Sequence, residues 1–132
     1  MKTNSVVAVS LTLLLTAAFG LAQVSADRVT AKVPHEFTAA GKLLPAGQYS
    51  FTYDADKRFV TIRGAGNEPG VIVPVVTLLA GAMHTTANDA HVVFDKVGNN
   101  YYLSEIWIPG IDGIALLTTK EKHEHEIVNV PR

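Results

Sequence analysis

Two histidines near the carboxyl end of the chain have the type and spacing of metal ligands. His123 and His125 flank Glu124, and residues two apart in an extended chain point to the same side. Two imidazoles could then share a zinc or copper ion, with a carboxylate completing the set. The alternative is a solvated polar tail, because charged residues surround both histidines. Other histidines could supply a third ligand: His35, His84 and His91.

An aromatic segment carries the second group of candidates. Glu105 shares one face of an extended segment with Tyr101 and Trp107, and a carboxylate beside aromatic rings can serve as an acid or base. Together with Tyr102, the same rings could instead stack on a sugar or an apolar ligand. Core packing of the rings, with Glu105 paired at the rim of a sheet, explains the pattern without any ligand.

Several other chemistries are excluded. The chain has no cysteine, which rules out disulfides, thiol catalysis and cysteine-type zinc sites. After residue 26 the serines are Ser50 and Ser104, and neither lies in a Gly-x-Ser-x-Gly elbow. The formal net charge is −1, without a basic stripe, so nucleic acid is not an expected partner.

These side chains must be positioned by strands, because alternation of apolar and polar residues dominates the chain. Turn signals separate the alternating runs, among them Pro45 with Gly47, and Gly98-Asn99-Asn100 as a tight hairpin. The 13 residues 71–83 are apolar on both faces, which indicates burial on two sides, although Pro74 argues for an edge or a bulge. The expected strands are 28–33, 48–53, 58–63, 91–97, 101–108 and 114–119.

The pattern predicts an all-β fold, as one small β-sandwich or barrel-like domain of about six to eight mainly antiparallel strands. The length of 132 residues suits one domain. We expect the β domain to span residues 27–119. Residues 120–132 form a charged tail, which is either a frayed end or a short terminal element.

The amino terminus has the organisation of a secretory signal peptide. Lys2 is followed by an uncharged, largely apolar stretch that ends in Val24-Ser25-Ala26, a small-x-small exit typical of cleavage. Residues 1–26 are therefore predicted to be removed, leaving Asp27 as the first residue and no membrane span. The protein would then be exported to the periplasm or the medium. An uncleaved anchor helix is the alternative, because the stretch is long enough to span a bilayer.

Two groups of motifs carry a resemblance to a known kind of protein. The first contains Val33-Pro34-His35-Glu36-Phe37 and Leu44-Pro45-Ala46-Gly47-Gln48-Tyr49, and the second contains Val92–Gly98 with Ser104-Glu105-Ile106-Trp107. The chain resembles small exported, uncharacterised all-β bacterial proteins with a Pro-x-x-Phe, Leu-Pro-Ala-Gly-x-Tyr and Ile-Trp pattern. The resemblance implies fold and export but no activity. His35 departs from it, because a large apolar residue is expected there.

Three functions follow from these residues. The first is a non-enzymatic exported binding or envelope-associated module, with its ligand surface on the strand that carries Tyr101, Tyr102, Glu105 and Trp107. A partner protein, a sugar or an apolar molecule would bind there. The second is a zinc- or copper-binding exported protein that uses His123 and His125. The third is a small hydrolase or isomerase with Glu105 as acid or base.

Overall fold

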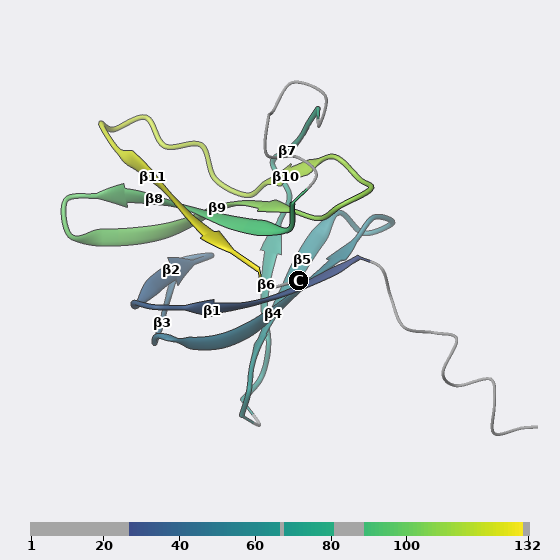
Figure 1. Ribbon diagram of the computed structural model, residues 1–132, viewed down its shortest axis with the longest axis horizontal. Coiled ribbons are helices and arrows are strands. Elements are labelled where there is room, and N and C mark those ends of the chain that lie inside the picture. Colours follow the sequence, from purple (N-terminus) through teal and green to yellow (C-terminus); the bar gives the residue numbers. More distant parts are fainter. Residues whose placement is uncertain (1–26, 67, 81–88, 131–132) are drawn as a thin grey trace, which may run out of the picture.

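The computed structural model describes residues 27–66, 68–80 and 89–130 (Figure 1). These ranges form eleven strands and no helix, which confirms the all-β prediction, although the strands outnumber the six to eight expected because several have only three or four residues. The predicted signal peptide, residues 1–26, lies outside the described residues. The strands are β1 (Arg28–Val33), β2 (Phe37–Ala39), β3 (Lys42–Leu44), β4 (Gly47–Asp54), β5 (Phe59–Gly64), β6 (Val71–Pro74), β7 (Thr77–Leu79), β8 (His91–Val97), β9 (Asn100–Trp107), β10 (Gly113–Ala115) and β11 (Glu124–Asn129).

The strands form two mainly antiparallel sheets that pack as a small sandwich (Figure 1). The first sheet has the order β1-β4-β5-β6. The second has the order β11-β8-β9-β10-β7, and β2 joins it through a parallel bridge to β9 while pairing with β3 on its other side. Among the described strands, β11 therefore lies at one edge of the second sheet, next to β8.

Alternation along the strands builds the core between the sheets. In β1, Val29, Ala31 and Val33 are buried while the residues between them are exposed. Phe51 and Ile62 of the first sheet share one buried apolar cluster with Phe94 and Ile106 of the second. Because the chain has no cysteine, this core must hold the domain together without disulfides.

The Leu-Pro-Ala-Gly-x-Tyr motif forms the corner between β3 and β4. The hydroxyl of Tyr49 donates a hydrogen bond of 2.6 Å to the backbone carbonyl of Pro45, the kind of bond that closes corners in other sandwiches. The ring of Tyr49 packs edge-on against Phe37, at 5.1 Å between centroids. The predicted hairpin at Gly98 is also present: Val97 pairs with Asn100, and Gly98 has a φ of 62°, which glycine adopts without strain.

The apolar run after residue 70 is not buried on both faces as its composition suggests. It divides into β6, an edge strand of the first sheet that ends at Pro74, and β7, which belongs to the second sheet. Ile72 and Val76 are each 56% exposed. Proline ends the edge strand because it cannot donate a ladder hydrogen bond, so the edge alternative is the correct one. Residues 81–83 of the run lie outside the described residues.

Two further expectations change at the carboxyl end. The strand expected at 114–119 is β10, Gly113–Ala115, and residues 116–123 then cross to the far edge of the sheet. Of the two alternatives for the charged tail, the structure has the terminal element, because β11 pairs antiparallel with β8 from Glu124 opposite Lys96 to Asn129 opposite His91. Within the described ranges, nothing helical is long and apolar enough to cross a bilayer.

Candidate metal centre

A buried carboxylate at the edge of the second sheet forms the centre of the candidate site. Asp95 is 2% exposed although it is ionisable. Its neighbour Phe94 points into the core, so Asp95 points to the opposite face of β8. Burying a carboxylate is costly unless it is paired or hydrogen-bonded, and its partners come from the carboxyl-terminal part of the chain.

Two histidines reach Asp95 from β11 and from the residue just before it. His125 lies directly opposite Asp95 in the β8–β11 ladder, and its Nδ1 is 2.9 Å from Asp95 Oδ1. His123 Nε2 is 3.9 Å from Asp95 Oδ2. One potential ligand atom from each of the three residues lies within 4.8 Å of the others. The predicted pair of histidines thus shares one carboxylate.

Hydrogen bonds orient the ligand atoms of this cluster. His123 Nδ1 donates to the backbone carbonyl of Glu121 at 2.7 Å, and with Nδ1 protonated the neutral ring has its lone pair on Nε2, the atom that faces Asp95. The hydroxyl of Thr119 donates to Asp95 Oδ2 at 2.6 Å. Metal-binding histidines commonly donate their second N–H to a carbonyl or a carboxylate in this way.

The separation between His123 and Asp95 fits a small divalent ion, whereas His125 Nδ1 is hydrogen-bonded to Asp95 Oδ1 at 2.9 Å, so His125 would bind the ion through Nε2 or give up that bond. The 3.9 Å between His123 Nε2 and Asp95 Oδ2 is too long for a hydrogen bond. It is within the span of two metal–ligand bonds of about 2.0–2.2 Å each. The cluster is open to solvent on one side, because the His125 side chain is 56% exposed. Three protein ligands and an open side leave at least one coordination position for water.

The histidines considered for a third ligand have other roles or positions. His35 Nε2 bonds to Glu126 Oε1, and its ring stacks on Tyr101 with centroids 3.5 Å apart. His91 is buried, with Nδ1 2.7 Å from the carbonyl of Asp89. His84 lies outside the described residues. Neither His35 nor His91 belongs to the group formed with Asp95.

Asp95 itself was not singled out by sequence reasoning. It lies in the otherwise apolar run of residues 92–94 and 97, next to Lys96, and nearly 30 residues from either histidine. The available signal was the presence of an acidic residue within a strand that is otherwise mostly apolar. Recognising it also required the pairing of the tail with β8, which residue spacing does not give.

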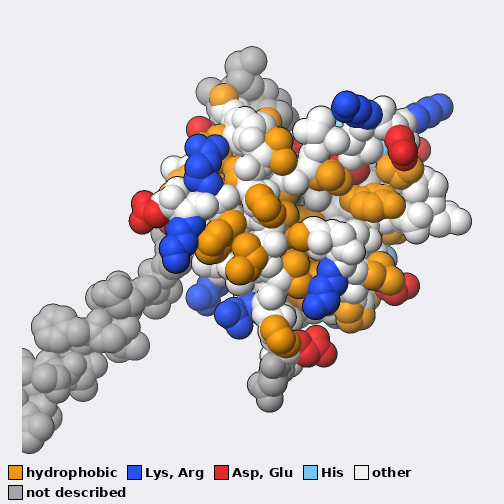
Figure 2. Space-filling view, turned by 180° about the vertical axis from the view of Figure 1, so that it is seen from behind, with side chains coloured by type: hydrophobic (Ala, Val, Ile, Leu, Met, Phe, Trp, Pro, Cys, Tyr) orange, Lys and Arg blue, Asp and Glu red, His pale blue; other side chains and the backbone are white. Residues whose placement is uncertain are grey.

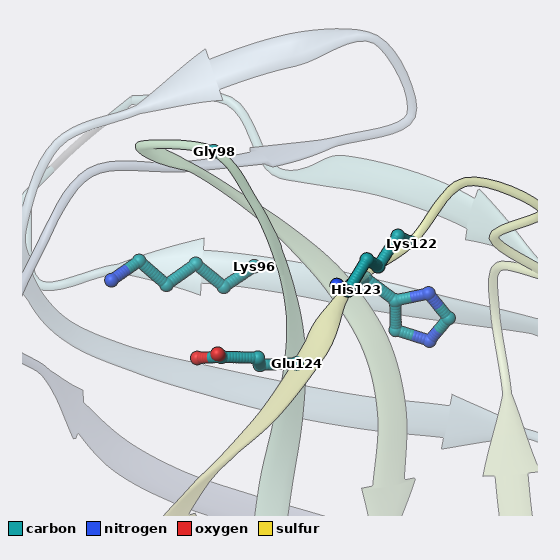
Figure 3. Close-up of a pocket in the computed structure, with 5 residues that line it drawn as sticks. All are labelled: Lys96, Gly98, Lys122, His123 and Glu124. Carbon is teal, nitrogen blue, oxygen red and sulfur yellow. The ribbon is translucent and has the colours of Figure 1, made fainter.

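A surface pocket lies beside the cluster and shares His123 with it. It is lined by Lys96, Gly98, Lys122, His123 and Glu124 (Figure 3). The side chains of Lys96 and Glu124 extend in one direction, and the imidazole of His123 points the opposite way (Figure 3). His123 thus belongs both to the pocket lining and to the group around Asp95, whereas the other four lining residues do not belong to that group.

The aromatic strand is largely packed rather than presented to solvent. Trp107 is 2% exposed, and its Nε1 donates to Glu105 Oε1 at 2.9 Å. A Cβ added at Gly113 would lie 2.5 Å from the indole, and the ring of His91 stacks on the indole at 5.7 Å between centroids. Trp107 is thus unavailable as a stacking platform, and Glu105 has a structural partner. Tyr101 and Tyr102 are half-buried.

Exposed apolar side chains gather elsewhere on the molecule. Figure 2 shows hydrophobic side chains across the middle of one face, with lysine and arginine side chains around them. A pocket that includes Val73, Val76, Tyr102 and Leu117 opens between the sheets. Of the four predicted platform residues, only Tyr102 lines this pocket. Among the residues that the structure describes, the exposed large apolar ones are Leu43, Ile72, Val76, Leu78, Leu117 and Ile127.

Comparisons with known proteins add no relative: no family model, no curated protein and no solved structure matches the chain. The chemistry of the site therefore rests on its own geometry. Two imidazoles and one carboxylate can bind a borderline divalent ion and leave it open to water on one side.

Proposed function

We propose that this chain is an exported, non-enzymatic binding protein whose ligand is a zinc or copper(II) ion. The observation that carries the proposal is the convergence of Asp95, His123 and His125, with one donor atom of each within 4.8 Å. Export rests on the signal-like organisation of residues 1–26, and the destination is the periplasm or the medium.

The donor set supports zinc or copper(II) over calcium or magnesium. Imidazole nitrogen favours borderline transition ions, whereas calcium and magnesium prefer six or more oxygen ligands. Residues that already lie together also lose little freedom when they bind an ion. Two hydrogen bonds support this preorganisation: Thr119 donates one to Asp95, and His123 donates the other to the Glu121 carbonyl.

The other two functions have less support. Glu105 as an acid or base would need a second acid or a histidine in a cleft, and its carboxylate instead accepts the Trp107 N–H. An apolar or protein ligand on the aromatic strand would need exposed rings, and Trp107 is buried. We therefore propose the binding function, with a metal ion as the ligand.

A zinc titration of the chelator-treated protein tests the proposal. We expect one site with a Kd of about 1 µM or tighter, equivalent to about −8 kcal/mol. Asp95→Asn and His125→Ala should each weaken binding at least about tenfold, since each removes a ligand. Glu124→Gln is the matched control, because this residue is adjacent to both histidines and its side chain points away from the His123 ring (Figure 3). Equal affinity in all four proteins would contradict the proposal.

A further inference from the structure

We infer that the metal ion, once bound as proposed above, clamps the carboxyl-terminal edge strand to the sandwich. This inference rests on the proposed metal centre and concerns what binding does to the fold. The ligands lie on two elements: Asp95 belongs to β8, while His123 and His125 belong to β11 and its approach. An ion bound by all three would cross-link β11 to a central strand of the sheet.

Side-chain burial holds β11 only weakly. Of its six residues, four are exposed and the other two, Glu126 and Val128, are half-buried. Little apolar area is therefore removed from water along this strand, and burial of such area is the main stabilising contribution in a small domain. The backbone ladder with β8 is continuous, but edge strands open more readily than central ones.

The two ends of β11 differ in how they are anchored. At the carboxyl end, Val128 and Val130 pack against the core, and Val130 N donates to the carbonyl of Ala90 at 3.0 Å. At the amino end, the anchors are polar: the contacts of His123 and His125 with Asp95, and the bond between Glu126 and His35. The ion would thus be held at the end of β11 that lacks apolar anchoring.

Metal binding stabilises the paired position of β11, because the site is lost when the strand opens. When β11 separates from β8, His125 moves away from Asp95 and the three-ligand site no longer exists. An ion that binds the closed state alone lowers the population of the open state by a factor of 1 + [ion]/Kd. At a free zinc concentration of about 100 times Kd, local opening of β11 should become about 100-fold rarer.

Hydrogen–deuterium exchange of the full chain, with and without zinc, tests this inference. We expect the backbone amides of β11 that are hydrogen-bonded to β8 to exchange about 100-fold more slowly when zinc is about 100 times Kd. Amides of β6 are the internal control, because β6 is an edge strand of the other sheet and can open without breaking the site. The His125→Gln variant, which keeps a polar side chain but no imidazole, should lose the zinc effect on β11.

Native mass spectrometry of the same samples separates the two proposals. If zinc is bound and β11 exchange does not change, or β6 slows equally, the clamp is wrong while the metal centre stands. If no zinc is bound to the wild-type chain, the proposed function fails, and the clamp fails with it. Zinc bound together with selective slowing of β11 supports both.

Discussion

Asp95 is the residue on which the site depends, because its carboxylate is buried and bonded at the same time. It is 2% exposed, and it accepts a hydrogen bond from Thr119 and faces His125 at 2.9 Å. A buried charge contributes favourably only when its partners are in place, and removing one partner of such a pair is strongly destabilising. The residue should therefore matter for stability even without metal.

Replacing Asp95 by alanine should destabilise the metal-free protein by about 1–3 kcal/mol, because the hydrogen-bonding groups of Thr119 and His125 lose their acceptor. Urea unfolding in the presence of a chelator measures this change. Asp56→Ala is the control, since Asp56 is exposed in the β4–β5 turn, and it should change stability by less than about 0.5 kcal/mol. Equal effects of the two substitutions would argue against a structural role for Asp95.

Gly113 is the second residue with a sharp structural requirement. A Cβ at this position would lie 2.5–2.7 Å from three atoms of the Trp107 indole. Gly113→Ala should therefore destabilise the fold by about 1–3 kcal/mol through overpacking, measured by thermal or urea unfolding. Gly66→Ala is the matched control, because nothing lies within 4 Å of a Cβ added there. A Gly113→Ala protein as stable as wild type would show that the indole can move aside.

At the residue scale, two of the three residues of the site could be proposed from the sequence. Spacing and residue type suggested His123 and His125 together, because their side chains point the same way in an extended segment. It could not supply Asp95, because that contact depends on which strand receives the tail. Trp107 was a candidate ligand residue because composition does not reveal that Gly113 leaves room for its indole.

At the scale of elements, long alternating strands were predictable and short ones were not. β1, β4 and β5 have the apolar-polar alternation of strands with one buried face. β2 and β3 have three residues each, which is too short for a period of two to be recognised. The sequence left β11 undecided between a frayed end and a terminal element. Four of its six residues are exposed, and only Glu126 and Val128 are half-buried, so no apolar face marks it as a strand.

The corner before β4 gives a prediction about alkaline pH. Burial, with a further contribution from the charge of Glu68, raises the pKa of the Tyr49 hydroxyl. The fold thus favours the neutral phenol over the phenolate. The stability that comes from this preference is complete below the unfolded pKa of about 10 and is lost as pH rises above it. Tyr49→Phe should remove this part of the alkaline loss.

Urea unfolding of wild type and Tyr49→Phe at about pH 8 and about pH 10.5 checks the expected sign. The variant should be less stable at the lower pH by about 1 kcal/mol, because it lacks the bond to the Pro45 carbonyl. The gap between the proteins should narrow at the higher pH. A gap that stays constant would mean that ionisation of Tyr49 is not linked to folding.

At the scale of the whole molecule, the chain is a two-sheet sandwich held by one apolar cluster and closed at one edge by a polar strand. No disulfide can reinforce it, since cysteine is absent. A metal ion at the β8–β11 edge would add a cross-link that the covalent chain lacks, and a bound metal stabilises the folded state by its binding free energy. The proposed binding function and the stability of the edge are therefore physically linked.

The most direct test is a crystal structure of the zinc-treated protein with data collected above and below the zinc absorption edge. We predict one anomalous peak within about 2.0–2.2 Å of a nitrogen of His123, a nitrogen of His125 and an oxygen of Asp95. A well-ordered site with no peak there, or a zinc ion held by other residues, would contradict the metal centre.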